Sequence, residues 1–325
     1  MTSIRDYGGE FALIGAISGI LGKPKDRKVI AGIGDDAAVI ALDKKRDMLV
    51  TVDMLVEGDH FRREWSTPRQ IGRKAMEVNV SDIAAMGGLP KYALVSISLP
   101  DDTTAEFVME LYRGMKDAAR KHRFDVIGGN TTHGSRLVID VIIIGEVEKN
   151  RLRLRSDAKA GDLICVTGTL GKSTAGLETL KAGVKGNVRE HLEPRCRLHE
   201  AREISKYANA MIDVSDGLSS EVGHICEMSD VGAEVFREKI PISMNTRSLA
   251  KNLGKDPVEF ALHGGEDFEL VFTIPERRLK RIRTRCQITV VGRITKKRHG
   301  ITLAWGKVKL PLGGGYDHFR LRRTS

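Results

Sequence analysis

The sequence contains few aromatic residues, few prolines and few cysteines. Phe, Trp and Tyr make up 5% of its 325 residues, and there are 9 Pro and 4 Cys. The low proline content argues against long disordered tracts. The four cysteines lie at least 30 residues apart, without a Cys-x-x-Cys pair or a histidine at zinc-finger spacing: Cys165, Cys196, Cys226 and Cys286. This spacing excludes a zinc finger and predicts buried, reduced thiols.

Long hydrophobic runs are also missing. The longest apolar stretches, such as residues 138–145, have the length of a strand and fall far short of the roughly 20 residues that a membrane span needs. No positively charged leader precedes an apolar core at the start of the chain, and Glu10 interrupts the early residues. We therefore expect a cytoplasmic protein that does not enter a membrane.

The net charge of +10 comes from the end of the chain. Residues 276–325 contain 15 Lys and Arg against Glu276 and Asp317, so the remaining residues are slightly acidic. A nucleic-acid-binding protein that uses this basic segment is one alternative function. However, few aromatic residues interrupt the segment, and its arginines between 277 and 285 fit a solvated helix that buries Leu279 and Ile282. We therefore do not expect a nucleic-acid partner.

The length and the hydrophobic content of 41% predict two domains with sizeable cores. The chain is strongly charged between residues 146 and 162, which makes this segment the best candidate for a boundary. We expect an N-terminal domain over residues 1–150 and a C-terminal α/β domain over residues 151–325 that completes the active site.

Hydrophobic periodicity predicts alternating helices and strands. The expected helices cover residues 10–21, 68–78, 103–122 and 218–228, and the expected strands cover 47–56, 92–99, 124–127, 137–147 and 163–167. The segment Gly168 to Thr174 resembles a phosphate-binding P-loop, but Val166 stands where that motif needs its first glycine. We interpret it as a tight turn between a strand and a helix.

Several aspartates stand where apolar residues are expected. Asp53 interrupts a strand that otherwise has a buried pattern, Asp213 ends the apolar run before Val214, and the pair Asp35-Asp36 precedes the run 37–41. A buried carboxylate must be paired, hydrogen-bonded or metal-bound, and few Lys or Arg lie in these segments. Oxygen ligands of this kind suit Mg²⁺ together with phosphate.

The triplet Val-Ser-Asp occurs twice, at residues 80–82 and 214–216, each time after an apolar stretch and before a helical pattern. Two Ser/Asp helix caps would give the same pattern. We expect that helices beginning after Asp82 and Asp216 point backbone N–H groups at an anion. Together with the carboxylates, these helix starts predict a polyphosphate site.

Motifs throughout the chain resemble the thiamine-monophosphate kinase family, which belongs to the ATP-using enzymes built like aminoimidazole ribonucleotide synthetase. The matching segments are residues 9–11 (GEF), 32–38 (GIGDDAA), 53 with 57–61 (D, EGDHF), 79–87 (NVSDIAAMG), 127–132 (IGGNTT), 155–156 (RS), 161–162 (GD), 166–171 (VTGTLG), 213–218 (DVSDGL), 264–270 (GGEDFEL) and 315–319 (GYDHF). His60, the Gly-Gly-Glu-Asp segment and the closing Gly-Tyr-Asp-His-Phe point to this family in particular.

The resemblance implies a two-domain α/β (α+β) fold like that of aminoimidazole ribonucleotide synthetase, with mixed sheets packed with helices. It implies ATP-dependent phosphorylation of thiamine phosphate to thiamine diphosphate by direct in-line transfer, with ATP as co-substrate and several Mg²⁺ ions. It also implies a homodimer in which the N-terminal ATP- and Mg²⁺-binding domains pack together. Another ATP-using enzyme of the same fold, of the aminoimidazole ribonucleotide synthetase type, is the second alternative.

The resemblance also assigns residues to roles. The positions that match metal ligands are Asp36, Thr51, Asp53, Asp82, Asp213 and Asp216. The ATP-contacting positions are Tyr112, Gly129, Asn130, Arg155 and Ser215, and the thiamine phosphate positions are His60, Glu266 and Tyr316. No protein nucleophile or base is expected, because the attacking phosphate oxygen is already ionised.

Two residues depart from the family pattern. Asn130 replaces an aspartate, and Val52 stands where a serine or threonine is common. Asn130 removes one negative charge while it keeps one carbonyl oxygen as a ligand, and Val52 removes one hydroxyl ligand. We therefore expect one Mg²⁺ ion to be held more weakly without loss of activity. The Mg²⁺ dependence of the wild type and of Asn130→Asp tests this expectation, and identical curves would contradict it.

Overall fold

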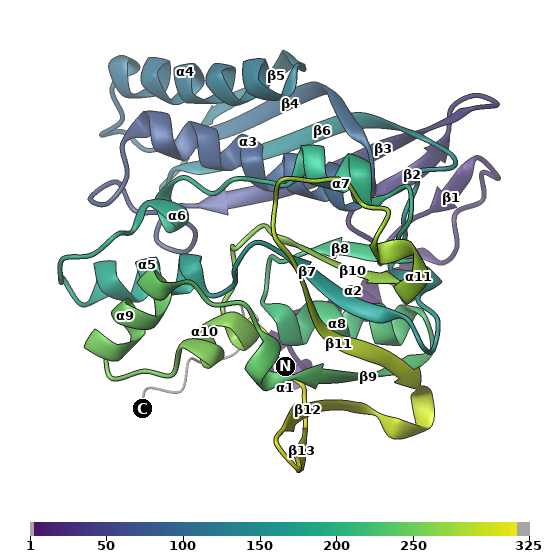
Figure 1. Ribbon diagram of the computed structural model, residues 1–325. Coiled ribbons are helices and arrows are strands. Elements are labelled where there is room, and N and C mark those ends of the chain that lie inside the picture. Colours follow the sequence, from purple (N-terminus) through teal and green to yellow (C-terminus); the bar gives the residue numbers. More distant parts are fainter. Residues whose placement is uncertain (1–2, 317–325) are drawn as a thin grey trace.

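The computed structural model describes residues 3–316. The chain forms two mixed sheets with a long helix between them (Figure 1). The first half of the chain forms the six-stranded sheet, with the order β1-β2-β3-β6-β4-β5. Its strands are β1 (Val29–Ala31), β2 (Ala38–Ala41), β3 (Arg46–Val56), β4 (Leu89–Leu99), β5 (Asp125–His133) and β6 (Val138–Glu148). Only β4 and β5 pair in parallel. The expected fold of mixed sheets packed with helices is confirmed.

The second half of the chain forms a seven-stranded sheet with the order β13-β12-β9-β11-β7-β10-β8. Its strands are β7 (Leu163–Thr167), β8 (Met211–Asp213), β9 (Val231–Phe236), β10 (Leu270–Ile274), β11 (Ile288–Lys296), β12 (Ile301–Trp305) and β13 (Val308–Pro311). The last strand of the first sheet, β6, ends at Glu148, and the first strand of the second sheet, β7, begins at Leu163. The division into domains of residues 1–150 and 151–325 stays a prediction.

Helices connect and cover the strands. In the described residues the α-helices are α1 (Ile4–Tyr7), α2 (Glu10–Leu21), α3 (Pro68–Ala85), α4 (Ala105–His122), α5 (Lys172–Lys181), α6 (Arg189–Leu192), α7 (Leu198–Ile204), α8 (Leu218–Met228), α9 (Met244–Asn252), α10 (Pro257–His263) and α11 (Glu276–Leu279). Short 3₁₀ turns are η1 (Arg155–Asp157), η2 (Arg237–Lys239) and η3 (Lys297–His299). No helix among the described residues is long and apolar enough to span a membrane.

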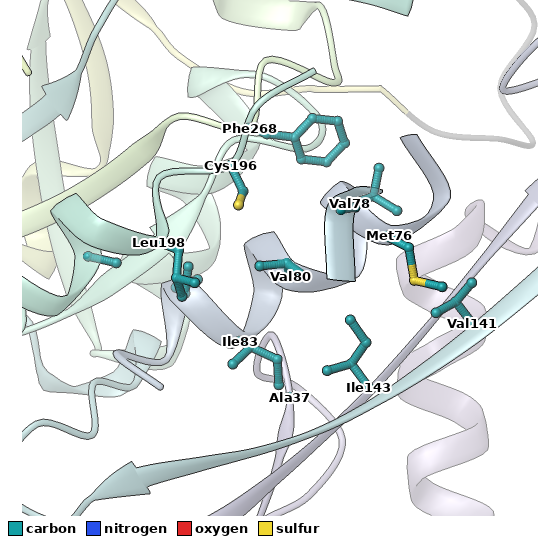
Figure 2. Packing of buried hydrophobic residues seen from close by; sticks show 14 of the residues in the cluster. Ala37, Met76, Val78, Val80, Ile83, Val141, Ile143, Cys196, Leu198 and Phe268 are labelled. Atoms are coloured by element: carbon teal, nitrogen blue, oxygen red, sulfur yellow. The ribbon is translucent and has the colours of Figure 1, made fainter. Parts of the chain in front are cut away.

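The helix α3 is the centre of the molecule. It begins with a capping box at Thr67, whose side chain accepts from the backbone N–H of Gln70, and it is buried over most of its length. Figure 2 shows Met76 beside Val141 of β6, and Phe268 and Leu198 from the second half of the chain lie on the other side of the helix. The helix therefore carries its residues to the contact between the two sheets.

Most of the sequence predictions of single elements are confirmed, and several are wrong in extent. The strand expected at 124–127 covers 125–133, and the strand expected at 92–99 begins at Leu89. The bounds of α2, α8 and β7 agree with the expected ones, and the turn after β7 leads into α5 as expected. The expected helix 68–78 continues to Ala85. The expected basic helix is wrong, because α11 is a single turn that ends at Leu279, although Ile282 is buried. The basic residues therefore do not form a continuous helical face.

The cysteines follow the prediction closely. All four are free; Cys165, Cys196 and Cys226 are buried, whereas Cys286 is partly exposed. Burial raises the pKa of Cys165 and of Cys226 to about 12, so these thiols stay protonated at neutral pH.

Candidate active site between the two sheets

Three carboxylates from both halves of the chain meet at the inner end of α3. Asp36 precedes β2, Asp82 lies on α3 and Asp213 ends β8, and one oxygen of each lies within 4.8 Å of the other two. The oxygen Oδ2 of Asp36 is buried without a hydrogen-bond partner. Like charges this close destabilise one another unless a cation is present, and three carboxylates with an unused buried oxygen fit a hard divalent cation such as Mg²⁺.

Two residues of β3 adjoin this cluster. The hydroxyl of Thr51 donates to Asp82 Oδ2 at 2.5 Å and to the carbonyl oxygen of Asp36 at 3.2 Å. The backbone N–H of Asp53 donates to Asn79 Oδ1 at 2.9 Å. Thr51 and Asp53 point to the same side of the strand, because side chains alternate along β3. The strand therefore delivers two oxygen groups beside the cluster.

The ionisation of these aspartates is strongly perturbed. The pKa of Asp53 is raised to about 6, mainly by burial and in addition by the charges of Asp36 and Asp140. Burial also raises the pKa of Asp82 and of Asp213 well above the usual range, and neighbouring aspartates add to both shifts. Such shifts are expected where several carboxylates share a site made for a cation, since metal ions favour the charged form.

Arg155 corrects the expectation that these aspartates lack basic partners. This arginine, in η1, donates from Nη2 to Asp36 Oδ1 at 2.5 Å, and its Nε lies 3.8 Å from Asp35 Oδ1. The pKa of Asp36 stays raised because burial outweighs the nearby guanidinium. Burial raises the pKa of Asp35 to about 7, with the Asp36 charge as the second cause. Asp35 was singled out in the sequence together with Asp36, but it was not among the predicted metal ligands.

The expected helix start at Asp82 is wrong. Asp82 lies in the last turn of α3, so the backbone N–H groups around it are already used within the helix. Its partner motif behaves as expected, since Asp216 precedes Gly217 and the start of α8. The same triplet therefore delivers a carboxylate from a helix end in one half of the chain and from a helix start in the other.

The two motifs of the second half pack backbone against backbone. The N–H of Glu266 donates to the carbonyl of Ser215 at 2.7 Å, and the N–H of Tyr316 donates to the carbonyl of Asp216 at 3.2 Å. A Cβ atom on Gly265 would lie 2.3 Å from the Ser215 oxygen, so only glycine fits there. Consecutive carbonyls of one turn thus hold two of the three residues predicted to bind thiamine phosphate.

Glu221 of α8 supports the same turn and was missed by the sequence analysis. One of its oxygens, Oε1, accepts from the N–H of Asp216 at 2.8 Å and of Ser215 at 3.2 Å. Burial raises the pKa of Glu221 well above its usual range, and the charge of Asp216 adds to the shift. The signal available in the sequence was a glutamate at a buried position in the first turn of a helix.

The third predicted substrate residue, His60, is joined to Glu266 through a lysine. Nδ1 of His60 accepts from the N–H of Val56 at 3.1 Å. The ammonium of Lys74 donates to the carbonyl oxygen of His60 at 2.8 Å and lies 2.7 Å from Glu266 Oε1. Lys74 was also missed, although a lysine inside the apolar pattern of α3 was a visible signal.

A cavity of about 530 Å³ lies beside the start of α8 and contains Tyr316 in its wall. Phe11, His224 and Ser220 line it together with the glycines 313–315. The rings of Phe11 and His224 lie 4.7 Å apart. Burial lowers the pKa of His224 to about 4, so its ring is neutral and can stack on a cationic or aromatic group. Asp317, His318 and Phe319 of the closing motif lie outside the described residues.

The predicted ATP residues other than Arg155 and Ser215 lie on the sheet and on α4. Tyr112 is half-buried on α4, and Gly129 and Asn130 are exposed on the edge strand β5. A Cβ atom on Gly129 would lie 1.8 Å from the Val95 oxygen, so this position requires glycine. Asn130 pairs in register with Ser96 of β4.

The valine at position 52 does not remove a ligand from the carboxylate cluster. Its side chain is 57% exposed and alternates with Thr51 and Asp53, so it points to the opposite face of the sheet. A hydroxyl in its place would also point away from the clustered carboxylates. The expectation that Asn130 weakens the binding of one Mg²⁺ ion stays a prediction.

A second buried polar cluster lies at the middle of α3. Glu77 Oε1 lies 3.0 Å from His122 Nε2 and accepts from Lys121 at 2.6 Å, and Oε2 accepts from the N–H of Cys196 at 3.1 Å. The Cys196 sulfur lies 3.7 Å from the same His122 nitrogen. Both carboxylate oxygens are therefore already satisfied, which is the pattern of a structural hydrogen-bond network rather than of a metal site.

Known proteins that match most of the chain belong to one family. Residues 34–147 match the family model described as AIR synthase related protein, N-terminal domain, and residues 159–303 match its C-terminal domain. The thiamine-monophosphate kinase of Aquifex aeolicus is 38% identical over 96% of this chain and 98% of its own length. The one from Bacillus subtilis is 37% identical over 90% of this chain and 94% of its own length.

Solved structures give the same result. The structure described as AaThiL complexed with AMPPCP and TMP has a TM-score of 0.87 and 37% identity, and the match covers 98% of this chain and 99% of that one. The hydrogenase maturation protein HypE in complex with ATP has a TM-score of 0.69 over 98% of this chain, but at 18% identity it shows the fold alone.

Proposed function

Because the chain belongs to the thiamine-monophosphate kinase family of AIR synthase related proteins, we propose that it transfers the γ-phosphoryl group of ATP to thiamine phosphate. An oxygen of the thiamine phosphate bonds to the γ-phosphorus, the bond from that phosphorus to the bridging oxygen breaks, and ADP leaves with the electron pair. The products are thiamine diphosphate and ADP. The observation that carries the proposal is the match, over nearly the whole chain, to a structure that holds an ATP analogue and TMP.

The residues of the site fit a reaction that needs no protein base. The attacking phosphate is ionised at neutral pH, so the obstacle is the repulsion between two polyanions and their alignment. We propose that Mg²⁺ is held by Asp36, Thr51, Asp53, Asp82, Asp213 and Asp216. The ion, when bound, would neutralise phosphate charge and orient the phosphate oxygens. The unpartnered oxygen of Asp36 and the mutual repulsion of the carboxylates support this assignment.

We propose that the nucleotide lies along Tyr112, Gly129, Asn130, Arg155 and Ser215. Arg155 carries most of this assignment, because a guanidinium binds phosphate oxygens through two parallel N–H groups. Its hydrogen bond to Asp36 also fixes the guanidinium beside a proposed metal ligand. The Ser215 hydroxyl lies on the turn that carries Asp216, so the nucleotide and metal groups share one support.

We propose that thiamine phosphate is bound by His60, Glu266 and Tyr316. The carboxylate of Glu266 is charged: burial would raise its pKa, but Lys74 and His191 lower it to about 2. A fixed negative charge suits the thiazolium cation of thiamine, and an aromatic ring such as that of Tyr316 offers a stacking surface. The hydrogen bonds of Glu266 and Tyr316 to consecutive carbonyls support a common subsite.

We further propose a homodimer that forms through the open face of the six-stranded sheet. One face of this sheet is covered by α3, whereas the other carries exposed apolar side chains: Val52, Met54 and Tyr92 are 57%, 52% and 47% exposed. The strand register places all three on the same face. The helix α2 adds a second apolar surface, since none of its residues is buried. Patches of this kind mark protein interfaces.

The proposed location is the cytoplasm, because the reaction consumes ATP and because the four cysteines are free rather than paired.

The direct test is incubation of the purified protein with Mg²⁺, ATP and thiamine phosphate, followed by chromatographic detection of thiamine diphosphate. Unphosphorylated thiamine is the comparison acceptor, because it lacks the ionised attacking group. We expect thiamine diphosphate from thiamine phosphate and no phosphorylation of thiamine. No product from thiamine phosphate, or equal use of both acceptors, would contradict the proposal.

A further inference from the structure

Lys74 occupies a position where a charge is costly. It lies on α3 with a side chain that is 3% exposed, and the ammonium has two oxygen partners: the His60 carbonyl at 2.8 Å and Glu266 Oε1 at 2.7 Å. Burying an ammonium is unfavourable by several kcal/mol unless it is paired and hydrogen-bonded. These two partners come from different halves of the chain, so one cation links the loop after β3 to the segment before β10.

Glu266, the acidic partner, is fixed from several directions. Its backbone has a φ of 64°, in the left-handed region that residues other than glycine rarely adopt, and the hydrogen bond to Ser215 holds it there. The other carboxylate oxygen, Oε2, lies 3.3 Å from Nδ1 of buried His191, which also lies 3.1 Å from the Ser173 hydroxyl. The side chain of Glu266 is nevertheless 25% exposed. One edge of a fixed, charged carboxylate therefore stays accessible.

We propose that Lys74 is a positioning residue that sets the specificity for thiamine phosphate by holding His60 and Glu266 in one fixed arrangement. The lysine itself is too buried to contact the substrate, so it acts through these two residues. The inference rests on the proposed function, because it deepens the assignment of His60 and Glu266. Neither the carboxylate cluster nor Arg155 is among the partners of Lys74, so binding of ATP should not depend on it.

A purely structural role predicts something different. If Lys74 only neutralises a buried carboxylate, its loss lowers the stability of the fold and affects both substrates alike. If it positions the subsite, its loss raises the KM for thiamine phosphate and leaves the KM for ATP unchanged. The ratio of the two KM values therefore separates the roles.

The test compares Lys74→Met with Lys172→Met. The second lysine is a matched control, because it forms an ion pair with the fully buried carboxylate of Glu269 and has no contact with His60 or Glu266 among those described. We expect Lys74→Met to raise the KM for thiamine phosphate by about tenfold or more, with the KM for ATP within about twofold of the wild type. Lys172→Met should lower the thermal midpoint and leave both KM values within about twofold.

A double variant keeps the proposal testable if Lys74→Met fails to fold. Lys74→Met/Glu266→Gln removes both charges, so no unpaired carboxylate is left. If Lys74 acts through Glu266, the double variant should have the same KM for thiamine phosphate as Glu266→Gln within about threefold. Multiplied effects of the two changes, an equal rise in both KM values, or an unchanged KM in Lys74→Met would overturn the inference.

The failure of the proposed function gives a separate result. If the wild type makes no thiamine diphosphate, the function itself is wrong and this inference is wrong with it. If the wild type is active and only the KM pattern differs from the expected one, the role of Lys74 alone is wrong.

Discussion

At the scale of single residues, the site depends on carboxylates that are unfavourable without a cation. Asp36, Asp82 and Asp213 bring three oxygens within 4.8 Å of one another, and Asp53 lies beside them. The hydroxyl of Ser81 donates to Asp213 Oδ2 at 2.5 Å and fixes the carboxylate that comes from the second half of the chain. The carboxylates of the site therefore repel one another where the phosphate groups are proposed to bind.

Asp53→Asn should separate activity from stability. Removing this charge relieves repulsion within the cluster, so the thermal midpoint without Mg²⁺ should stay equal or rise by a few degrees. The rate of thiamine diphosphate formation should fall by about 100-fold or more, because a proposed metal ligand is lost. Calorimetry and the product assay measure the two effects.

Asp47→Asn is the matched control for that variant. Asp47 lies on the same strand and the same side, is buried whereas Asp53 is half-buried, and pairs with Lys149 at 3.3 Å away from the cluster. It should lower stability slightly and keep activity within about threefold of the wild type. Equal loss of activity in the two variants would contradict the special role of Asp53.

Glu77 should make the stability of the fold depend on pH, independently of catalysis. Burial would raise its pKa, but His122 and Lys121 lower it to about 2, below the ordinary value of 4.5. The folded state therefore favours the charged carboxylate, and this stabilisation is complete above about pH 4.5 and lost as the pH falls towards 2. The free energy of unfolding of the wild type should exceed that of Glu77→Gln at pH 6, and the difference should shrink at pH 3.5. Urea unfolding at both pH values measures it, and a constant difference would refute the assignment.

At the scale of elements, two glycine-containing segments make the site possible by packing without side chains between them. Gly265 approaches Ser215, and Gly217 approaches the Leu262 carbonyl so closely that a Cβ would lie 2.7 Å from it. The segment 264–268 can therefore lie directly on the turn 214–217. This contact holds Glu266 beside the residues proposed to bind nucleotide and metal.

Gly265→Ala should damage this contact. The added methyl group would lie 2.3 Å from the Ser215 oxygen, so the backbone must shift, and we expect a loss of about 1–3 kcal/mol in the free energy of unfolding. Gly223→Ala is the control, because its Cβ would meet nothing within 4 Å and alanine favours a helix. Denaturant unfolding should show a loss in the first variant and none in the second. Equal stability of Gly265→Ala and the wild type would refute the requirement for glycine.

The hydrophobic pattern of α3 did not predict where this helix ends. The bounds of α8 and β7 could be predicted because their hydrophobic patterns end at glycines or at charged residues. The pattern of α3 could not be divided in this way, because the helix is buried on most sides, so polar residues such as Asn79, Ser81 and Asp82 interrupt its apolar run without ending it. Asp82 therefore looked like a residue before a helix, whereas it lies in the last turn of one.

At the scale of the whole molecule, the site exists because elements far apart in the sequence meet. Motifs made it possible to predict the individual carboxylates, since an aspartate inside an apolar strand pattern is visible in the sequence. Two ion pairs could not be predicted in that way. Arg155 pairs with Asp36, which lies 119 residues away, and Lys74 pairs with Glu266, which lies in the other half of the chain. Such contacts depend on how the two sheets pack around α3.

The proposed dimer predicts a change of mass in solution. Met54 is 52% exposed on the open face of the sheet, so Met54→Lys places a charge in the proposed interface and should shift the protein to a monomer. Met109 is 50% exposed on α4 and serves as the control, since Met109→Lys should leave the dimer intact. Light scattering coupled to size-exclusion chromatography measures both masses. A monomeric wild type, or a dimeric Met54→Lys variant, would contradict the proposed interface.

The central claim is that the carboxylate cluster between the two sheets supports direct transfer of the γ-phosphoryl group to thiamine phosphate. The measurement that tests it most directly follows the label from [γ-³²P]ATP in the wild type and in Asp213→Asn, with Mg²⁺ present. We predict label in thiamine diphosphate with one ADP formed per product in the wild type, and a loss of about 100-fold or more in the variant. Unlabelled product, no product, or full activity of Asp213→Asn would contradict the claim.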